Sequence, residues 1–110
     1  MQAQVFKAMG DPARLTMLSR LATGGNHTIG SLSENLGMSR QGARKQLQVL
    51  VAAELIELHK AGRETAVTIN IGQLQQARAF IRDLERQWDQ RLHALKAFVE
   101  QPNPSSEPEN

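Results

Sequence analysis

The sequence predicts a mainly α fold that carries one small β-hairpin and ends in a long helix. Apolar residues recur at helical spacing through most of the 110 residues, whereas this period is lost after residue 53 and residues 65–71 carry alternating β-branched residues. Aromatic residues make up only 4% of the chain, so aliphatic side chains must pack the helices. The length suits one domain, which we expect over residues 1–100. Residues 101–110 are polar and proline-rich and predict a disordered tail.

Two helices are predicted at the N-terminus. Val5, Phe6 and Met9 give residues 2–9 the pattern of a short helix. Asp11 then suits the N-cap of a second helix, with Pro12 at its first position. The buried face expected for this second helix consists of Leu15, Leu18, Leu21 and Ala22.

The next segment predicts a helix-turn-helix. Thr28 can cap a short helix that stops at Gly37, and Ser39 can cap a second helix over residues 40–52. The inward positions are Ile29, Leu32 and Leu36 in the first helix and Ala43, Leu47 and Leu50 in the second. Two short helices joined by a three-residue turn that contains glycine are typical of a helix-turn-helix.

A β-hairpin is predicted after this motif. Residues 55–59 read as a strand with Ile56 and Leu58 on one face, residues 61–64 as a turn, and residues 65–71 as the returning strand. A hairpin that follows a helix-turn-helix is the element order of a winged helix. The predicted fold class is therefore a winged helix-turn-helix.

One long helix is predicted from Gln73 to about Val99. It carries an apolar stripe at spacings of three and four residues: Leu74, Ala77, Ile81, Leu84, Trp88, Leu92, Leu95 and Val99. The chain has no other long helix to cover this stripe, so a second copy of the same helix is the economical partner.

Positive charge is concentrated in the middle of the chain. Residues 38–63 hold five basic and two acidic residues, whereas residues 73–110 hold five basic and six acidic ones. A basic second helix in this motif favours contact with phosphates and base edges, although a charged face is often merely solvated. The candidate DNA contacts are Ser39, Arg40, Gln41, Arg44, Lys45 and Gln48 on the helix, and Lys60 and Arg63 in the hairpin.

Several segments together resemble the ArsR-type winged-helix repressors. Residues 6–15, FKAMGDPARL, resemble the family's opening motif, and residues 29–39 resemble its first helix-turn-helix element. Residues 45–50, KQLQVL, stand where the family usually reads K-H-L-x-V-L, and residues 62–64 resemble the wing. Residues 88–96 are similar to a cysteine-free subgroup that lacks the usual metal sites and is often found beside START-like lipid-binding proteins.

The resemblance implies a homodimer that binds an inverted-repeat operator in double-stranded DNA and represses transcription. The first and last helices would form the dimer, with recognition helices in successive major grooves. The implied dimer residues are Val5, Phe6, Leu74, Ile81, Leu84, Trp88, Leu92 and Leu95. Gln46 replaces the family's common histidine, and we expect it still to hydrogen-bond a phosphate or a base.

Two competing interpretations stay open. The first is a protein-interaction dimer that uses the same scaffold without DNA. The second is a metal-responsive repressor with an atypical site at Asp89 and His93, which lie four residues apart on one helix face. We favour a surface contact for that pair, because the Cys-x-Cys and Asp-x-His patterns of the family's metal sites are absent.

Other functional classes find little support in the sequence. The chain contains no cysteine, no apolar run of membrane-spanning length and no hydrolase or phosphate-loop motif. We therefore expect no enzyme activity, no cofactor, no metal and no membrane partner, and a cytoplasmic location. The sequence leaves three possibilities for release of the repressor from DNA: a small apolar ligand, a partner protein, or no effector at all.

Overall fold

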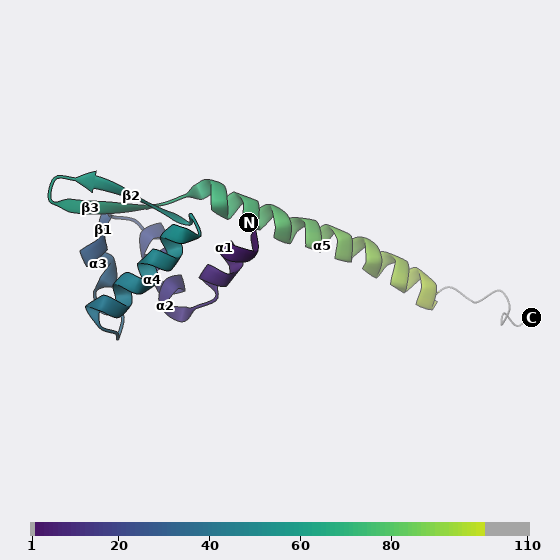
Figure 1. The fold of residues 1–110 in the computed structure, drawn as a ribbon. Helices are drawn as coiled ribbons and strands as arrows, with labels where there is room; N and C mark the ends of the chain where they lie inside the picture. Colours follow the sequence, from purple (N-terminus) through teal and green to yellow (C-terminus); the bar gives the residue numbers. More distant parts are fainter. Residues whose placement is uncertain (1, 101–110) are drawn as a thin grey trace, which may run out of the picture. The chain divides into compact units, whose positions relative to one another are not determined.

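The computed structural model describes residues 2–100, which form two compact units divided after Ala77. The tail predicted at residues 101–110 lies outside the described residues. Five helices and three strands follow in this order (Figure 1): α1 (Gln2–Met9), α2 (Pro12–Ala22), β1 (His27–Thr28), α3 (Ile29–Ser33), α4 (Arg40–Ala52), β2 (Ile56–Ala61), β3 (Glu64–Ile69) and α5 (Ile71–Glu100). The first unit contains the winged helix-turn-helix that the sequence predicts, with the first turns of α5.

Helix α2 begins as predicted, but part of its predicted buried face is wrong. The Asp11 carboxylate accepts hydrogen bonds from the backbone N–H groups of Ala13 (3.0 Å) and Arg14 (3.2 Å), which caps the helix. Leu18 is buried as expected, whereas Leu15 is 45% exposed and Met17 takes the central place in the core. The core of the first unit consists of Val5, Ala8, Met17, Leu18, Leu32, Ala43, Leu47, Leu50, Ala53, Leu55, Ile56, Val67 and Ala77.

Helix α3 is shorter than predicted, so the turn of the helix-turn-helix is longer. The Thr28 hydroxyl accepts a hydrogen bond from the Ser31 N–H (3.1 Å), and the Ser31 hydroxyl accepts one from the Thr28 N–H (2.9 Å). The helix then ends at Ser33, not at Gly37. Glu34 is already extended, with a ψ of 143°, and Asn35 follows with a left-handed φ of 57°, so Leu36 lies outside the helix. Residues 34–39 form the link to α4.

The link is fixed from the side by Arg20 of α2. Its guanidinium donates hydrogen bonds to the carbonyl oxygens of Leu32 (3.3 Å), Glu34 and Asn35 (3.1 Å). These carbonyls have no helical partner after α3 ends, and a planar five-donor group can satisfy all of them together. Arg20 therefore sets where the chain turns towards α4.

The sheet has three strands in the order β1-β3-β2, one more than the sequence predicts. His27 and Thr28 pair with Val67 and Ala66 of β3 and so form an edge strand. The hairpin turn is also tighter than expected, because Ala61 and Glu64 pair across a turn of two residues. A positive φ of 65° at Gly62 and not at Arg63 matches a type II′ turn, the kind that fits the twist of a hairpin.

The two apolar residues expected on one face of β2 differ in burial. Ile56 is 2% exposed and belongs to the core, whereas Leu58 is 43% exposed. The hairpin therefore extends beyond the helices that cover its base, and its outer half lies on the surface (Figure 1).

Helix α4 ends in a Schellman motif built on a residue other than glycine. The Leu55 N–H donates to the Leu50 carbonyl (3.0 Å), and the Glu54 N–H donates to the Val51 carbonyl (2.9 Å). Glu54 takes the left-handed conformation that this motif needs, with a φ of 59°. The motif turns the chain sharply from α4 into β2.

Helix α5 starts two residues before the predicted position. The Asn70 side chain accepts a hydrogen bond from the Gly72 N–H (3.1 Å), as an N-cap does. The helix then runs unbroken to Glu100, and Leu74 and Ala77 pack in the core of the first unit.

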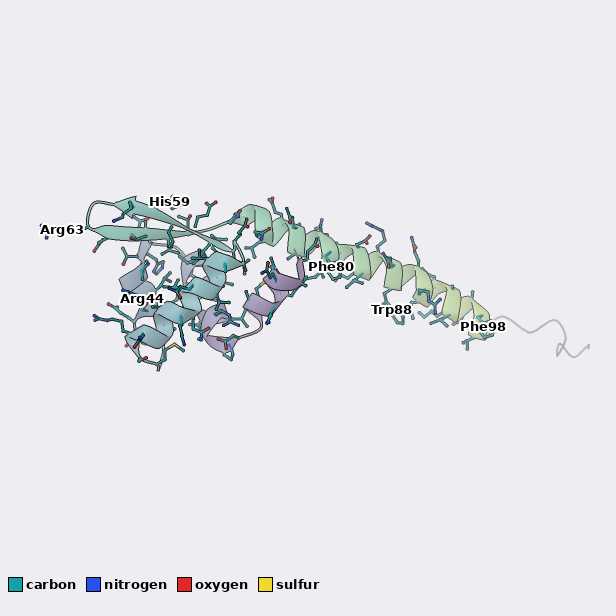
Figure 2. The ribbon with its side chains drawn as sticks, in the orientation of Figure 1. Arg44, His59, Arg63, Phe80, Trp88 and Phe98 are labelled. Atoms are coloured by element: carbon teal, nitrogen blue, oxygen red, sulfur yellow. The ribbon has the colours of Figure 1, made fainter. Side chains whose placement is uncertain are left out.

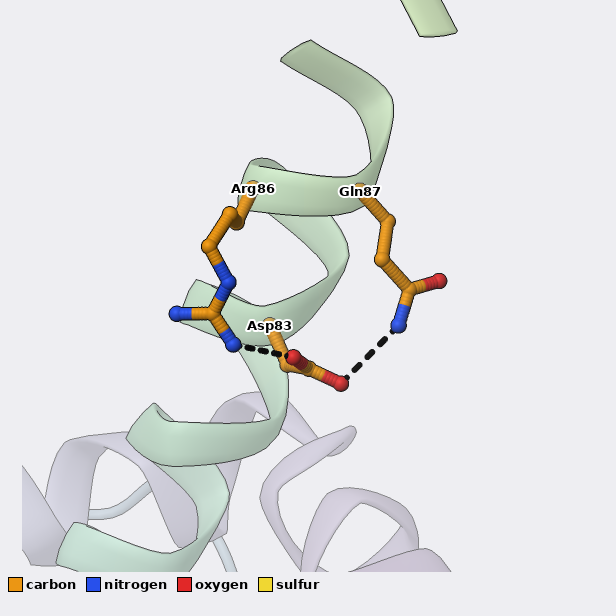
Figure 3. A network of polar contacts seen from close by, with 3 residues as sticks. All are labelled: Asp83, Arg86 and Gln87. Carbon is orange, nitrogen blue, oxygen red and sulfur yellow. Dashed lines mark hydrogen bonds and ion pairs between the residues drawn. The ribbon is translucent and has the colours of Figure 1, made fainter. Parts of the chain in front are cut away.

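The second unit described by the structure is the rest of this helix. On its surface Asp83 accepts hydrogen bonds from Arg86 (2.5 Å) and Gln87 (3.0 Å) one turn away (Figure 3). Among the residues described, no helix combines the length and apolar character needed to cross a membrane.

Candidate DNA-binding surface

Helix α4 presents its polar residues on the side opposite to the core. The Ser39 hydroxyl accepts a hydrogen bond from the Gly42 N–H (3.0 Å) and so fixes the first turn of the helix. Ala43, Leu47 and Leu50 are buried as predicted. All six residues proposed to contact DNA here are exposed: Ser39, Arg40, Gln41, Arg44, Lys45 and Gln48. Arg40, Arg44 and Gln48 follow at intervals of four residues and share one face.

A groove of about 580 Å³ connects this face with the wing. Its lining includes Arg40 and Arg44 of α4 and Arg63 from the tip of the hairpin. Figure 2 shows Arg44 on the helix and Arg63 at the end of the wing, so the charges come from two separate elements. The lining also includes Thr28, the N-cap of α3, and Ile29 and Gly30 from its first turn. The structure thus brings together three guanidinium groups that lie up to 23 positions apart in the sequence.

The other predicted contacts lie outside this groove. Ser39, Gln41, Lys45 and Gln48 continue the exposed surface of α4 but do not line it. Lys60 pairs with Thr65 in the hairpin and is likewise exposed. Arginine suits such a groove because its planar fork binds a phosphate through two hydrogen bonds.

The predicted dimer residues differ strongly in exposure. Val5 is 2% exposed and belongs to the core, and Phe6 and Leu74 are half-buried beside it. The residues further along α5 are exposed, as Figure 2 shows for Trp88: Ile81 (45%), Leu84 (50%), Trp88 (57%), Leu92 (37%) and Leu95 (41%). The sequence prediction left out Phe98, which is 80% exposed and lies next to Val99 at the end of the stripe.

Comparison with known proteins identifies the family of this chain. A family model described as a helix-turn-helix domain matches residues 9–59. The transcriptional repressor SdpR of Bacillus subtilis (strain 168) is 35% identical over 71 residues, which cover 64% of this chain and 78% of SdpR. The structure of an ArsR-like transcriptional regulator from Rhodococcus sp. RHA1 is 32% identical, with a TM-score of 0.78, and the match covers 92% of this chain and 94% of that one. The chain belongs to the ArsR-type winged-helix transcriptional regulators. The predicted family and the predicted DNA-binding regulatory function are thereby confirmed.

A more distant structure shares the fold of this ArsR-type chain. It is the homodimeric winged helix-turn-helix DNA-binding domain of a possible ArsR-family transcriptional regulator from Mycobacterium bovis. Its identity is 24% and its TM-score 0.57, and the match covers 84% of this chain and 82% of that one.

Gln46 of this ArsR-type chain is half-buried and hydrogen-bonds within the protein, and its expected contact with DNA stays a prediction. Its side-chain oxygen accepts a hydrogen bond from the Arg14 guanidinium, which also donates to the Ala8 carbonyl (2.6 Å). The contact therefore ties α4 to α2 and to the end of α1. Sequence reasoning missed this, although Gln46 follows buried Ala43 by three residues and so lies towards the same side of the helix.

The Asp89 and His93 pair lies on α5 with limited contact. The His93 Nε2 and Asp89 Oδ2 atoms are 3.9 Å apart, and their side chains are 78% and 70% exposed. The part of the chain that the structure describes holds no group of three or more His, Cys, Asp or Glu residues placed to hold a metal ion. One helix thus offers two ligands, fewer than the three or four protein ligands of a zinc site.

Proposed function

We propose that this ArsR-type regulator is a repressor that binds an inverted-repeat operator as a homodimer. The observation that carries the proposal is the groove lined by Arg40, Arg44 and Arg63. A helix-turn-helix places its second helix in the major groove, and a basic hairpin beside it can contact the neighbouring phosphates. Helix α4 would then read bases, chiefly through Arg40 and Gln41, while Arg63 and Lys60 hold the backbone.

The homodimer is supported by the apolar face of α5. Five large apolar side chains from Ile81 to Leu95 are more than one third exposed, and all lie on one side of the helix. Contiguous apolar surface of this extent is rare on a monomer and marks an interaction site. The same helix of a second copy offers a self-complementary face, as two-fold symmetry requires. The M. bovis domain is described as homodimeric, which agrees with a dimer of this chain.

Repression would follow from steric blocking of a promoter. No catalytic residue is needed for that, and the relatives described above are transcriptional regulators, so we infer that the chain is not an enzyme. A regulator of promoter DNA would act in the cytoplasm. An effector, whether a small apolar ligand or a partner protein, would act by changing the dimer or the position of α4.

The first experiment is a fluorescence-anisotropy titration with labelled DNA. The probes are the duplex from upstream of the gene and a scrambled duplex of the same composition, each at two salt concentrations. If the dimer neutralises about six to eight phosphates, the logarithm of the association constant falls against that of salt with a slope of roughly −5 to −7. Selective binding at two protomers per duplex supports the proposal, and equal, salt-insensitive binding contradicts it.

A pair of double variants separates DNA binding from the protein-interaction alternative. Arg44→Ala with Lys45→Ala removes two exposed charges from α4, hence four from a dimer. We expect the salt slope to become shallower by roughly 3 to 4, with affinity for the preferred duplex lost and dimer mass unchanged. The matched control is Arg82→Ala with Lys96→Ala, which removes the same charge from exposed positions on α5. Equal binding by both variants would favour the protein-interaction module.

A further inference from the structure

The groove between α4 and the wing contains two carboxylates as well as three guanidinium groups. Glu34 lines it from the end of α3, and Glu64 lines it from the first position of β3. A surface built only to attract phosphates would not place two negative charges beside three positive ones. The two glutamates lie next to the proposed DNA contacts, but a negative charge cannot help to attract DNA phosphates.

Both glutamates are held by their backbones. Arg20 donates a hydrogen bond to the Glu34 carbonyl, and the Glu34 N–H donates to the Ser31 carbonyl (3.4 Å). Glu64 pairs with Ala61 directly beside the hairpin turn. In the part of the chain that the structure describes, neither carboxylate forms an ion pair or hydrogen bond with the arginines of the groove. Neither charge is therefore taken up by a direct ion pair with these arginines.

We propose that Glu34 and Glu64 are specificity-determining residues that fix the register of the DNA backbone in this groove. This inference rests on the proposed function. In one register the phosphates lie against Arg44 and Arg63, Arg40 reaches the bases, and both carboxylates stay clear of the backbone. In other registers a phosphate meets a carboxylate, and the like charges repel. Repulsion of this kind suppresses wrong alignments and leaves the correct one intact.

The shared groove allows the repulsion to act. Both glutamates and all three arginines line it, and salt fully screens exposed charges only beyond the Debye length of about 8 Å at physiological ionic strength. A phosphate that enters the groove beside a glutamate is therefore repelled by it. Non-specific binding depends almost wholly on phosphate contacts, so it suffers most from the repulsion.

The test compares selective and non-selective binding in charge-neutral variants. A duplex selected by the wild-type chain from a random-sequence library and a scrambled version of it are the two probes. Glu34→Gln with Glu64→Gln keeps the shape of both side chains. We expect it to bind the scrambled duplex about 5- to 10-fold more tightly and the selected duplex about 2-fold more tightly, so that discrimination falls about 3- to 5-fold.

Glu57→Gln, doubled with Glu85→Gln, is the matched control. Both positions are exposed and lie outside the groove, and the control removes the same number of negative charges. It should change both affinities by less than about 2-fold and leave discrimination unaltered. Equal discrimination in the wild type and the groove variant, or equal effects of the two double variants, overturns the inference while the proposed function stands. If the wild type selects no sequence, the proposed function fails and the inference with it.

Discussion

Replacing Arg20 tests whether one side chain holds the turn of the helix-turn-helix. Arg20→Met keeps most of the aliphatic stem and removes three hydrogen bonds to the carbonyls of Leu32, Glu34 and Asn35. Two of these bonds are exposed, so water can replace part of their energy, and each contributes about 0.5–1 kcal/mol net. The expected loss is about 1.5–3 kcal/mol in the free energy of unfolding. For a unit of this size, a loss of about 2 kcal/mol lowers Tm by about 8–16 °C.

The assay is urea unfolding followed by circular dichroism at one protomer concentration, because the stability of a dimer depends on concentration. Arg20→Lys keeps the charge but cannot reach three carbonyls with one planar group, so it should recover less than half of the loss. Arg82→Met, at an exposed position of α5, is the control and should leave the midpoint unchanged. An unfolding free energy for Arg20→Met within about 0.5 kcal/mol of the wild type would refute the proposed role of Arg20 in holding the turn.

Three further substitutions examine other parts of the chain. Glu54→Gly should raise stability by about 1 kcal/mol in the same unfolding assay, because glycine takes the left-handed C-terminal position of α4 without strain; a loss of stability would contradict this. Gln46→Ala should cost about 1 kcal/mol because it removes one hydrogen bond of the Arg14 guanidinium, while the DNA affinity of the folded protein stays within about 2-fold; a large, selective loss of affinity would show that Gln46 contacts DNA. Trp88→Glu should dissociate the dimer in sedimentation velocity with the helical circular dichroism of the first unit retained; an unchanged mass would exclude this face as the interface.

Local signals in the sequence predicted most of the fold. Asp11, Thr28 and Ser39 each cap the helix they were expected to cap, because capping depends on a side chain and N–H groups two or three residues away. The alternation in residues 65–69 predicted β3 for an equally local reason. These signals needed no knowledge of the tertiary structure.

The errors arose where distant residues decide the outcome. Strand β1 has two residues and no pattern of its own, and it exists because Val67 and Ala66 offer it a partner. The carbonyls left free by the early end of α3 are satisfied by Arg20, twelve or more residues away. Arg63 was predicted as a DNA contact from its place at the hairpin tip. That it lines the same groove as Arg40 and Arg44 depends on how the hairpin lies over α3. The same holds for Glu34 and Glu64, which no local pattern marks.

The short strand β1 divides the wing into two parts of different stiffness. At the base, β3 is held between β1 and β2, and Thr28 belongs both to the sheet and to the cap of α3. Beyond Thr65 the hairpin is a ribbon of two strands, which is weakly stable alone and bends easily. Arg63 therefore lies at the tip of a flexible hairpin, whereas Arg40 and Arg44 lie on a rigid helix. The hairpin can follow the varying width of DNA grooves. Changes at its tip should therefore alter which DNA shapes the protein accepts, without changing which bases α4 reads.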